Sequence, residues 1–308
     1  MHEGQPRFIL PLALFIAILA VSTASIFIRF AQGEAPSLVI AALRLTFATL
    51  LLAPIAITRH RAEWMALTRN EILLGAFSGL FLAAHFATWI SSLEYTTVAS
   101  SVVFVSTGPL WVALLSPFLL NERLARAAII GLIIAILGGT LIALSDACIW
   151  ENGLRCPDLD QVLQGRAMQG NFLALIGAWT VSGYLIIGRK LRAKMSLIPY
   201  IFLVYGIAAL ALLVTALVAG QSLFGYPAQT YGWIFLLAAF PQLIGHSTYN
   251  WALRYLPAAF VAVTTLGEPI GSAILAFFIL QETPALAVIV GGVLILLGIY
   301  LASKREQA

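Results

Sequence analysis

Long apolar segments alternate with short polar ones along the whole chain of 308 residues. Each apolar segment is close to the roughly 20 residues that a helix needs to cross a hydrocarbon layer about 30 Å thick. Because these segments recur along the whole chain, the pattern predicts a polytopic, all-α membrane protein and not a soluble domain with a single anchor. We place ten transmembrane helices at residues 8–30, 36–58, 71–93, 96–120, 126–145, 169–189, 197–219, 231–253, 257–280 and 285–303.

The composition points the same way. Hydrophobic residues make up 61% of the chain and charged residues 10%, whereas soluble domains have roughly 45–50% and 25%. A surface of this composition could not face water. The net charge of +4 is explained by basic residues in loops beside a membrane, so we expect no nucleic-acid partner.

The positions of the basic residues predict the orientation, because membrane insertion leaves Lys and Arg mostly on the cytoplasmic side. With both termini inside, 13 basic residues fall in the inner loops and tails. The outer side receives Arg29, Arg155 and Arg166, and Arg44 lies within a helix. We therefore expect an integral protein of a bacterial inner (cytoplasmic) membrane, with both termini in the cytoplasm.

Both cysteines of the chain, Cys148 and Cys156, lie in the polar loop 146–168. The predicted orientation places this loop on the extracytoplasmic side, where an oxidising environment permits a disulfide. Two free thiols are an equal alternative, because the sequence does not give the geometry of the loop.

The two halves of the chain are related by a shift of 160 residues, which aligns Tyr95 with Tyr255 and Glu122 with Glu282. Over residues 95–142, 16 of 48 aligned positions are identical without a gap. An apolar composition alone does not produce matched tyrosines and glutamates. We infer a tandem duplication, with repeats at residues 8–145 and 169–303 on either side of the loop 146–168.

Each repeat contains five predicted helices, and five is an odd number. The second repeat must therefore lie upside down relative to the first. Inverted repeats of this kind are typical of secondary transporters, whose substrate site lies between the repeats near the middle of the membrane. The predicted fold is thus ten transmembrane helices, arranged as two inverted five-helix repeats around a central cavity.

Two stretches carry a resemblance to a known family. PLWVALLSPFLLNERL (residues 109–124) and EPIGSAILAFFILQETP (residues 268–284) are each a helix that begins at a proline and ends at a glutamate, followed by a glycine-rich helix. They resemble the paired EamA repeats of the drug/metabolite transporter superfamily, and the resemblance covers residues 10–303. It implies a central cavity with the fifth and tenth helices at the periphery, and a carrier of amino acids, other metabolites or toxic compounds, often an exporter.

Glu268 is the strongest candidate for a functional residue. A carboxylate in the middle of a membrane helix costs about 2.5–3.5 kcal/mol on insertion scales, and such residues are functional candidates by default. The resemblance matches it to the acid–proline pair of the second repeat, whereas the first repeat has Gly108 at this position. We expect Glu268 to bind a cationic group or to carry a proton; the alternative is a carboxyl group held by hydrogen bonds between helices.

Other polar side chains recur on single helix faces. Gln242, His246 and Asn250 follow one another at four-residue spacing, which places them on one side of the eighth helix. We predict that the cavity and its substrate site are lined by His85, Trp89, Thr107, Trp111, Trp179, Gln242, His246, Tyr249, Asn250 and Glu268. For proton coupling we assign Glu268, assisted by His246 and Arg44.

Several of these residues have a structural alternative. His85 could be a packing histidine, and Trp89 and Trp111 could belong to the core or to an aromatic belt. Arg44 could pair with Glu268, hold a substrate carboxylate or extend to the outer interface. The motifs GLIIAILGG (131–139) and GGVLILLG (291–298) place small residues on one face of the fifth and tenth helices. They favour packing within the chain, with a homodimer contact as the alternative.

Motifs for other chemistry are missing. The sequence has no GxxxxGK[ST] phosphate loop, no HExxH and no cluster of Cys and His at metal-ligand spacing. We therefore expect a protein that is not an enzyme and that needs no metal or cofactor.

The sequence favours a secondary transporter that exports small metabolites such as amino acids by alternating access, with coupling to protons. Its partners would be a small-molecule substrate, the lipid bilayer and protons. The alternatives are an uncoupled facilitator, an uptake carrier and, from another class, a membrane-embedded enzyme or sensor.

Overall fold

The computed structural model describes residues 9–119, 126–147, 149–150, 154–155, 164–256 and 258–303. Within these residues, six stretches of helix are long and apolar enough to cross a membrane: Ile9–Gln32, Ser37–Arg59, Arg69–Ser92, Arg166–Arg192, Leu197–Val218 and Phe260–Leu280. Shorter apolar helices cover Val98–Val112, Ile129–Ile142 and Leu286–Leu301. The chain is therefore a helical membrane protein, as the hydrophobic pattern predicted.

The helices of the first half lie in the order α1 (Ile9–Ser22), α2 (Ala24–Gln32), α3 (Ser37–Arg59), α4 (Arg61–Met65), α5 (Arg69–Ser92), α6 (Val98–Val105), α7 (Gly108–Leu119) and α8 (Arg126–Ala147). The second half has α10 (Arg166–Arg192), α11 (Leu197–Val218), α12 (Ala228–Leu237), the π-helix η1 (Ala238–His246), α13 (Ser247–Ala252), α14 (Ala258–Thr264), α15 (Gly267–Leu275), the π-helix η2 (Ala276–Leu280) and α16 (Leu286–Ser303).

The loop between the halves contains a short antiparallel strand pair, β1 (Ile149–Trp150) and β2 (Leu154–Arg155), with Ile149 opposite Arg155. The hydrophobic pattern gave no sign of these strands, because two residues are too few for an alternation to be read. Cys148 and Cys156 lie outside the described residues.

Four of the ten predicted helices are discontinuous. The predicted fourth helix is broken at Ser106 and Thr107, between α6 and α7, and the ninth at Thr265 and Leu266, between α14 and α15. Each new helix then has a proline in its first turn, Pro109 as the second residue of α7 and Pro269 as the third residue of α15. Proline suits the first turn because its missing N–H would have no partner within the helix there.

The other two breaks are milder. Thr23 separates α1 from α2, and the predicted eighth helix passes through the π-helix η1 around Pro241. The predicted second, third and seventh helices, in contrast, correspond to the single helices α3, α5 and α11.

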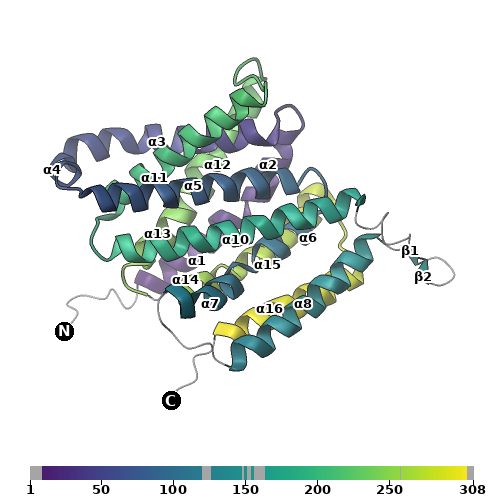
Figure 1. The fold of residues 1–308 in the computed structure, drawn as a ribbon. Coiled ribbons are helices and arrows are strands. Elements are labelled where there is room, and N and C mark those ends of the chain that lie inside the picture. The colour runs from purple at the N-terminus through teal and green to yellow at the C-terminus, as the bar shows by residue number, and fades with distance from the viewer. Residues whose placement is uncertain are drawn as a thin grey trace.

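The packing of the helices repeats when the two halves are exchanged. Helix α5 packs against α10, and α1 packs in the equivalent way against η1. Helix α10 contacts α6 and α7, as α1 contacts α15, and α3 packs against its own counterpart α11. One large apolar core runs through this bundle. The arrangement in Figure 1 is therefore close to two-fold symmetric in its contacts.

Helices α8 and α16 form an arm that lies beside the bundle (Figure 1). The two helices cross at glycines: a Cβ added at Gly138 would lie 2.5 Å from the carbonyl oxygen of Gly291, and one added at Gly291 would lie 2.6 Å from that of Gly138. This is the close backbone approach that small residues permit between membrane helices. The glycine motifs thus pack within the chain, as favoured from the sequence.

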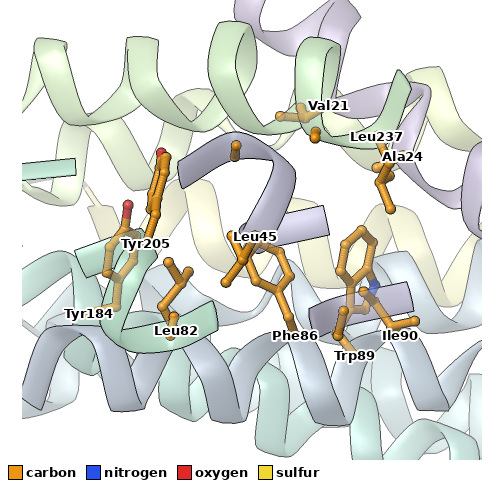
Figure 2. Close-up of a cluster of buried hydrophobic side chains, with 14 of the residues drawn as sticks. Val21, Ala24, Leu45, Leu82, Phe86, Trp89, Ile90, Tyr184, Tyr205 and Leu237 are labelled. Atoms are coloured by element: carbon orange, nitrogen blue, oxygen red, sulfur yellow. The ribbon is translucent and has the colours of Figure 1, made fainter. Parts of the chain in front are cut away.

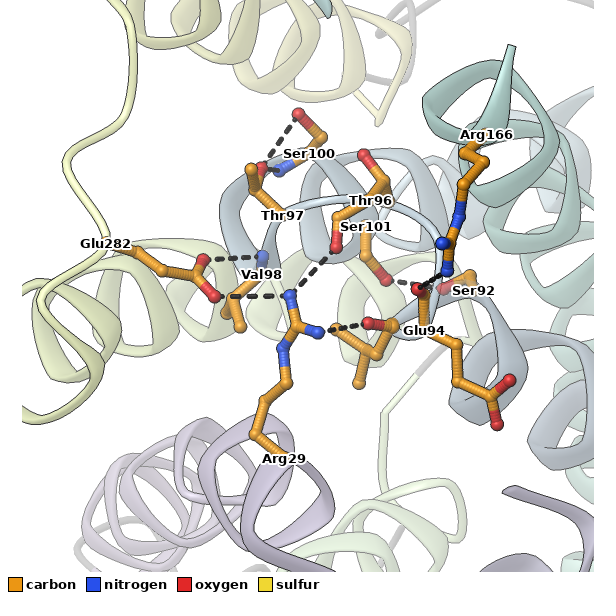
Figure 3. A network of polar contacts seen from close by, with 11 residues as sticks. Arg29, Ser92, Glu94, Thr96, Thr97, Val98, Ser100, Ser101, Arg166 and Glu282 are labelled. Atoms are coloured by element: carbon orange, nitrogen blue, oxygen red, sulfur yellow. Dashed lines mark hydrogen bonds and ion pairs between the residues drawn. The ribbon is translucent and has the colours of Figure 1, made fainter. Parts of the chain in front are cut away.

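A polar network joins several helix ends at one end of the bundle (Figure 3). Arg29, near the end of α2, donates to the carbonyl oxygens of Leu93 and Thr96 after α5, and it forms a 3.2 Å ion pair with Glu282. The other carboxylate oxygen of Glu282 accepts from the backbone N–H of Val98 at the start of α6, at 2.9 Å. Glu282 therefore connects the second half of the chain to three helices of the first.

Part of this network recurs at equivalent positions of the second half. Arg189 donates to the carbonyl oxygen of Leu253, 160 residues after the Arg29 contact to Leu93. Likewise, Gln32 donates to Ile90 and Arg192 donates to the carbonyl oxygen of Asn250. Glu122, the counterpart of Glu282, lies outside the described residues.

The glycine crossing predicts a position-specific loss of stability. We expect Gly291→Ala to destabilise the protein by about 1–3 kcal/mol, the usual cost of overpacking, because its Cβ would lie 2.6 Å from both the carbonyl oxygen of Gly138 and the side chain of Ile142. Gly292→Ala is the matched control, since its Cβ would lie 3.5 Å from the Val103 side chain, in ordinary contact. Thermal unfolding in detergent measures both; equal unfolding temperatures for the two variants would contradict the prediction.

Candidate functional site

A cavity lies inside the bundle where the helix breaks of the two halves meet. Its volume is about 60 Å³, well below the roughly 300–1,000 Å³ of typical small-molecule pockets. Its walls come from α5, the break between α6 and α7, the middle of α10, the end of η1 with α13, and the break between α14 and α15. The lining residues are His85, Trp89, Val105, Ser106, Gly108, Pro109, Val181, Tyr184, Leu185, His246, Tyr249, Ala262, Thr265 and Glu268.

Five of the residues predicted for the site therefore line one cavity: His85, Trp89, His246, Tyr249 and Glu268. Glu268 reaches it from the first turn of α15. Among the residues that line the cavity, Glu268 is the one with a carboxyl group.

Aromatic and imidazole rings form a continuous wall. The His85 ring stacks on Trp89 with centroids 5.9 Å apart and lies 6.5 Å from the His246 ring. Phe86 contacts His246 from the next position of α5, at 5.4 Å. Figure 2 shows Phe86 and Trp89 side by side in the buried core. The two imidazoles therefore belong to one cluster, although they come from different halves of the chain.

Hydrogen bonds hold part of this wall in place. His85 Nδ1 donates to the carbonyl oxygen of Gly177 at 2.9 Å, which leaves Nε2 as the acceptor of the neutral ring. Trp89 Nε1 and the Tyr249 hydroxyl are buried and have no hydrogen-bond partner among the described residues. Unpaired buried donors are costly, so the wall is left with capacity to bind a polar group of a ligand.

Arg44 lies behind the wall. Its side chain is fully buried, so the alternative of an arginine that extends to the membrane interface does not apply. Nε donates to Gln242 Oε1 at 3.0 Å, and the guanidinium lies over the Phe86 ring, 4.0 Å from its centroid. Nη1 and Nη2 have no hydrogen-bond partner in the described part of the chain.

The other predicted coupling residues surround this cation. Glu268, His85 and His246 all interact electrostatically with Arg44. No ion pair joins Arg44 to Glu268 within the described residues, and the amide of Gln242 occupies Nε instead. A buried guanidinium with two free nitrogens in a medium of low dielectric constant is costly, and an anionic group would compensate it.

Asn250 and Gln242 support the wall without lining the cavity. Asn250 donates to the hydroxyl groups of Tyr184 and Tyr205, whose rings lie side by side in Figure 2. Of these, Tyr184 lines the cavity. The polar face of the eighth predicted helix is thus buried against other helices, and His246 is the member of its stripe that reaches the cavity.

Three predicted site residues lie elsewhere. Thr107 and Trp111 line a separate groove beside α8, and Trp179 contacts Trp111 with centroids 5.2 Å apart while 39% of its surface stays exposed. The break between α6 and α7 explains this placement. Its Val105, Ser106, Gly108 and Pro109 face the cavity, whereas Phe104, Thr107, Leu110 and Trp111 face the groove.

The sequence interpretation missed several wall residues. Ser106 and Thr265 belong to the two helix breaks, and Val181 and Tyr184 come from α10. The prolines that the 160-residue shift aligns could have identified Ser106 and Thr265, because Ser106 lies three residues before Pro109 and Thr265 lies four residues before Pro269. No comparable signal singles out Val181 or Tyr184 among the apolar residues of their helix.

Comparison with known proteins agrees with the duplicated architecture. The model of the EamA-like transporter family matches the chain twice, at residues 9–144 and 168–304. An uncharacterized transporter of Archaeoglobus fulgidus is 24% identical over 91% of this chain and 93% of its own length. The uncharacterized transporter YetK of Bacillus subtilis is 23% identical over 79% of this chain and 71% of its own length.

A solved crystal structure shares the fold, with a TM-score of 0.66 at 19% identity over 94% of this chain and 95% of that chain. The apolar helices and the family match together identify an integral membrane protein. The chain belongs to the EamA-like transporter family, as the helix motifs at residues 109–124 and 268–284 indicated.

The hydrogen bond between Arg44 and Gln242 allows a prediction about stability. Removing the buried charge and removing its hydrogen-bond partner should affect the stability of the protein differently. We expect Gln242→Leu to destabilise the protein by about 1.5–3 kcal/mol, because it removes a hydrogen bond to a buried charged group. Arg44→Met keeps a similar volume and removes the charge, so it should cost less or even stabilise the protein. Thermal unfolding of both variants measures this order; a larger loss for Arg44→Met would refute it.

Proposed function

We propose that this protein is a secondary transporter that exports small metabolites such as amino acids by alternating access. The observation that carries the proposal is Glu268, an acid in a cavity between the two halves of a membrane protein, beside two imidazoles and a buried guanidinium. Ionisable residues inside a membrane mark substrate or proton pathways.

The two-fold pattern of contacts supports alternating access. If the second repeat is inverted, the packing of α5 on α10 and of α1 on η1 represents the same interface seen from opposite sides of the membrane. Exchanging the conformations of the repeats would then open the cavity to the other side, as in other transporters with inverted repeats. The ten spans predicted from the sequence would give the two repeats opposite orientations in the membrane.

The size of the cavity supports a closed state. About 60 Å³ is far less than the roughly 300–1,000 Å³ of typical small-molecule pockets, so the walls must separate to admit a metabolite. The helix breaks at residues 106–107 and 265–266 and the π-helix at Pro241 are points at which that movement can take place. All of them are at or next to wall residues.

The charges support coupling to protons. Binding of a proton by Glu268 changes the net charge of the group formed with Arg44 and His246 by one unit. In a medium of low dielectric constant, such a change strongly alters the electrostatic interactions between the residues that form the cavity walls. In the proposed cycle Glu268 exchanges a proton for a cationic group of the substrate, and His85, Trp89, Tyr249 and His246 contact the rest of it.

The distribution of charges supports an orientation with both termini in the cytoplasm of a bacterial inner membrane. Arg29, Glu94, Glu282 and Arg166 meet at one end of the bundle. The basic residues Arg59, Lys190, Arg192 and Lys194 lie on helix ends that this topology assigns to the opposite, cytoplasmic side.

Transport in proteoliposomes tests the function. We expect purified protein to carry radiolabelled amino acids, supplied as a mixture, across the bilayer, and an imposed pH gradient to increase the initial rate. Glu268→Gln should abolish the response to the gradient, because its amide cannot exchange a proton. Glu34→Gln, an exposed acid at a loop, is the matched control and should transport like the wild type.

Each part of this experiment tests one alternative function. Flux that ignores the gradient in the wild type would identify an uncoupled facilitator. Accumulation in the direction of the proton gradient, together with the proton, would identify an uptake carrier. Undiminished coupled flux in Glu268→Gln would remove that residue from the mechanism, and the absence of flux for every metabolite tested would refute transport itself.

A further inference from the structure

The arm formed by α8 and α16 leaves a large groove between itself and the bundle. The groove has a volume of about 430 Å³ and lies between α7, α8 and α10. Apolar side chains make up most of its walls, among them Leu110, Leu114, Ala135, Ile136, Phe172 and Ile295. It is thus about seven times as large as the central cavity of about 60 Å³.

The groove opens on a surface that faces hydrocarbon. Ile136 and Phe172 line it and still expose 57% and 54% of their surfaces. Ile129, Ile133 and Leu137 of α8, the helix that carries Ile136, are similarly exposed, and α8 is apolar on every side. The mouth of the groove therefore continues into the lipid-facing surface of the arm, and not into an aqueous loop region.

Water is a poor occupant of such a space. Cavities with apolar walls stay dry, because a buried water needs two to four polar partners. The polar groups in reach are few, and Trp111 Nε1 already donates to Thr107 Oγ1 at 3.2 Å. An empty groove would also forfeit dispersion contacts along all its walls. Hydrocarbon from the bilayer satisfies both conditions.

A second groove beside the arm, lined by residues of α6, α15 and α16, is smaller. Pro269, Ile270, Val288, Ile289 and Leu296 line a groove between α15 and α16, at positions that correspond in part to the walls of the first. Its volume is about 150 Å³. The groove beside α10 is thus nearly three times as large as this second groove.

We propose that the groove between α7, α8 and α10 is a binding site for one acyl chain of a bilayer phospholipid. The acyl chain lies against Trp111 and Phe172 on the bundle side of the groove, and against Ile136 and Thr140 of α8 on the other side. The same helix break that forms the bundle wall of the groove forms a wall of the central cavity on its other face. The lipid site therefore lies next to the cavity and is independent of which metabolite the cavity accepts.

A groove-filling variant tests the site. Thr140→Phe places a ring in the groove from α8, and Leu137→Phe places the same ring on the exposed outer face of that helix as the matched control. Native mass spectrometry of protein purified in mild detergent from phosphatidylethanolamine and phosphatidylglycerol vesicles counts the retained phospholipids. We expect the wild type and Leu137→Phe to retain one phospholipid more than Thr140→Phe.

Fluorescence in the bilayer provides the second readout. In vesicles of phosphatidylcholine brominated on the acyl chains, the emission of Trp111, measured as the difference between the wild type and Trp111→Phe, should be quenched. Thr140→Phe should lose most of this quenching, and Leu137→Phe should keep it. Should Thr140→Phe fail to fold, Leu175→Phe fills the groove from α10 and takes its place.

Three outcomes would overturn the proposal. Equal lipid retention and equal quenching in all variants would show that no chain occupies the groove. Quenching of Trp111 that disappears at a high ratio of protein to lipid would identify a second copy of the chain as the occupant. Quenching by brominated lipid that a transported metabolite abolishes would make the groove part of the substrate path.

Discussion

Backbone hydrogen bonding in a solvent without water is the constraint on which this structure depends. In the hydrocarbon of a bilayer every N–H and C=O group must find its partner within the protein, so helices can be interrupted only where other parts of the chain or a polar cavity meet the freed groups. The breaks at residues 106–107 and 265–266 and the π-helix at residues 238–246 all obey this rule, because each contributes to the wall of the central cavity. The helix interruptions and the cavity therefore occur at the same place in the fold. The fold places its irregular backbone where a ligand can use it.

This constraint also explains which parts of the fold the sequence predicts well. Helices such as α3, α5 and α11 satisfy all their hydrogen bonds internally, and their lengths match the apolar segments from which they were predicted. The broken spans look identical in a hydrophobicity pattern, since Ser106, Thr107 and Thr265 are compatible with a helix and the interruption depends on partners from other segments. Only the prolines that follow, Pro109 and Pro269, carry a local signal.

The candidate site divides in the same way. His85, His246 and Glu268 were predicted because titratable groups in an apolar segment need a reason to be there, and the structure brings them to one cavity. Trp111 and Trp179 were assigned to that cavity by residue type and helical spacing, but spacing measured across Thr107 does not hold once the helix breaks. Asn250 shares a helix face with His246, yet its amide is used to hold Tyr184 and Tyr205. Helical periodicity shows which residues share one face of a helix, but it does not show which of them line the cavity.

Comparison of the two repeats separates residues that maintain the architecture from residues that can work on a substrate. Arg29 and Arg189 are identical in the two repeats and make the same contact with a carbonyl oxygen at the end of a helix. The ionisable residues at the cavity all break the repeat: under the 160-residue shift, Glu268 aligns with Gly108, His246 with Phe86, His85 with Gly245, and Arg44 with Val204. A duplicated scaffold must preserve what both halves need for packing, whereas a single substrate lying across the axis meets a different wall from each half. In the proposed transporter, the departures from symmetry, more than the symmetric residues, are therefore the positions at which a ligand would be distinguished.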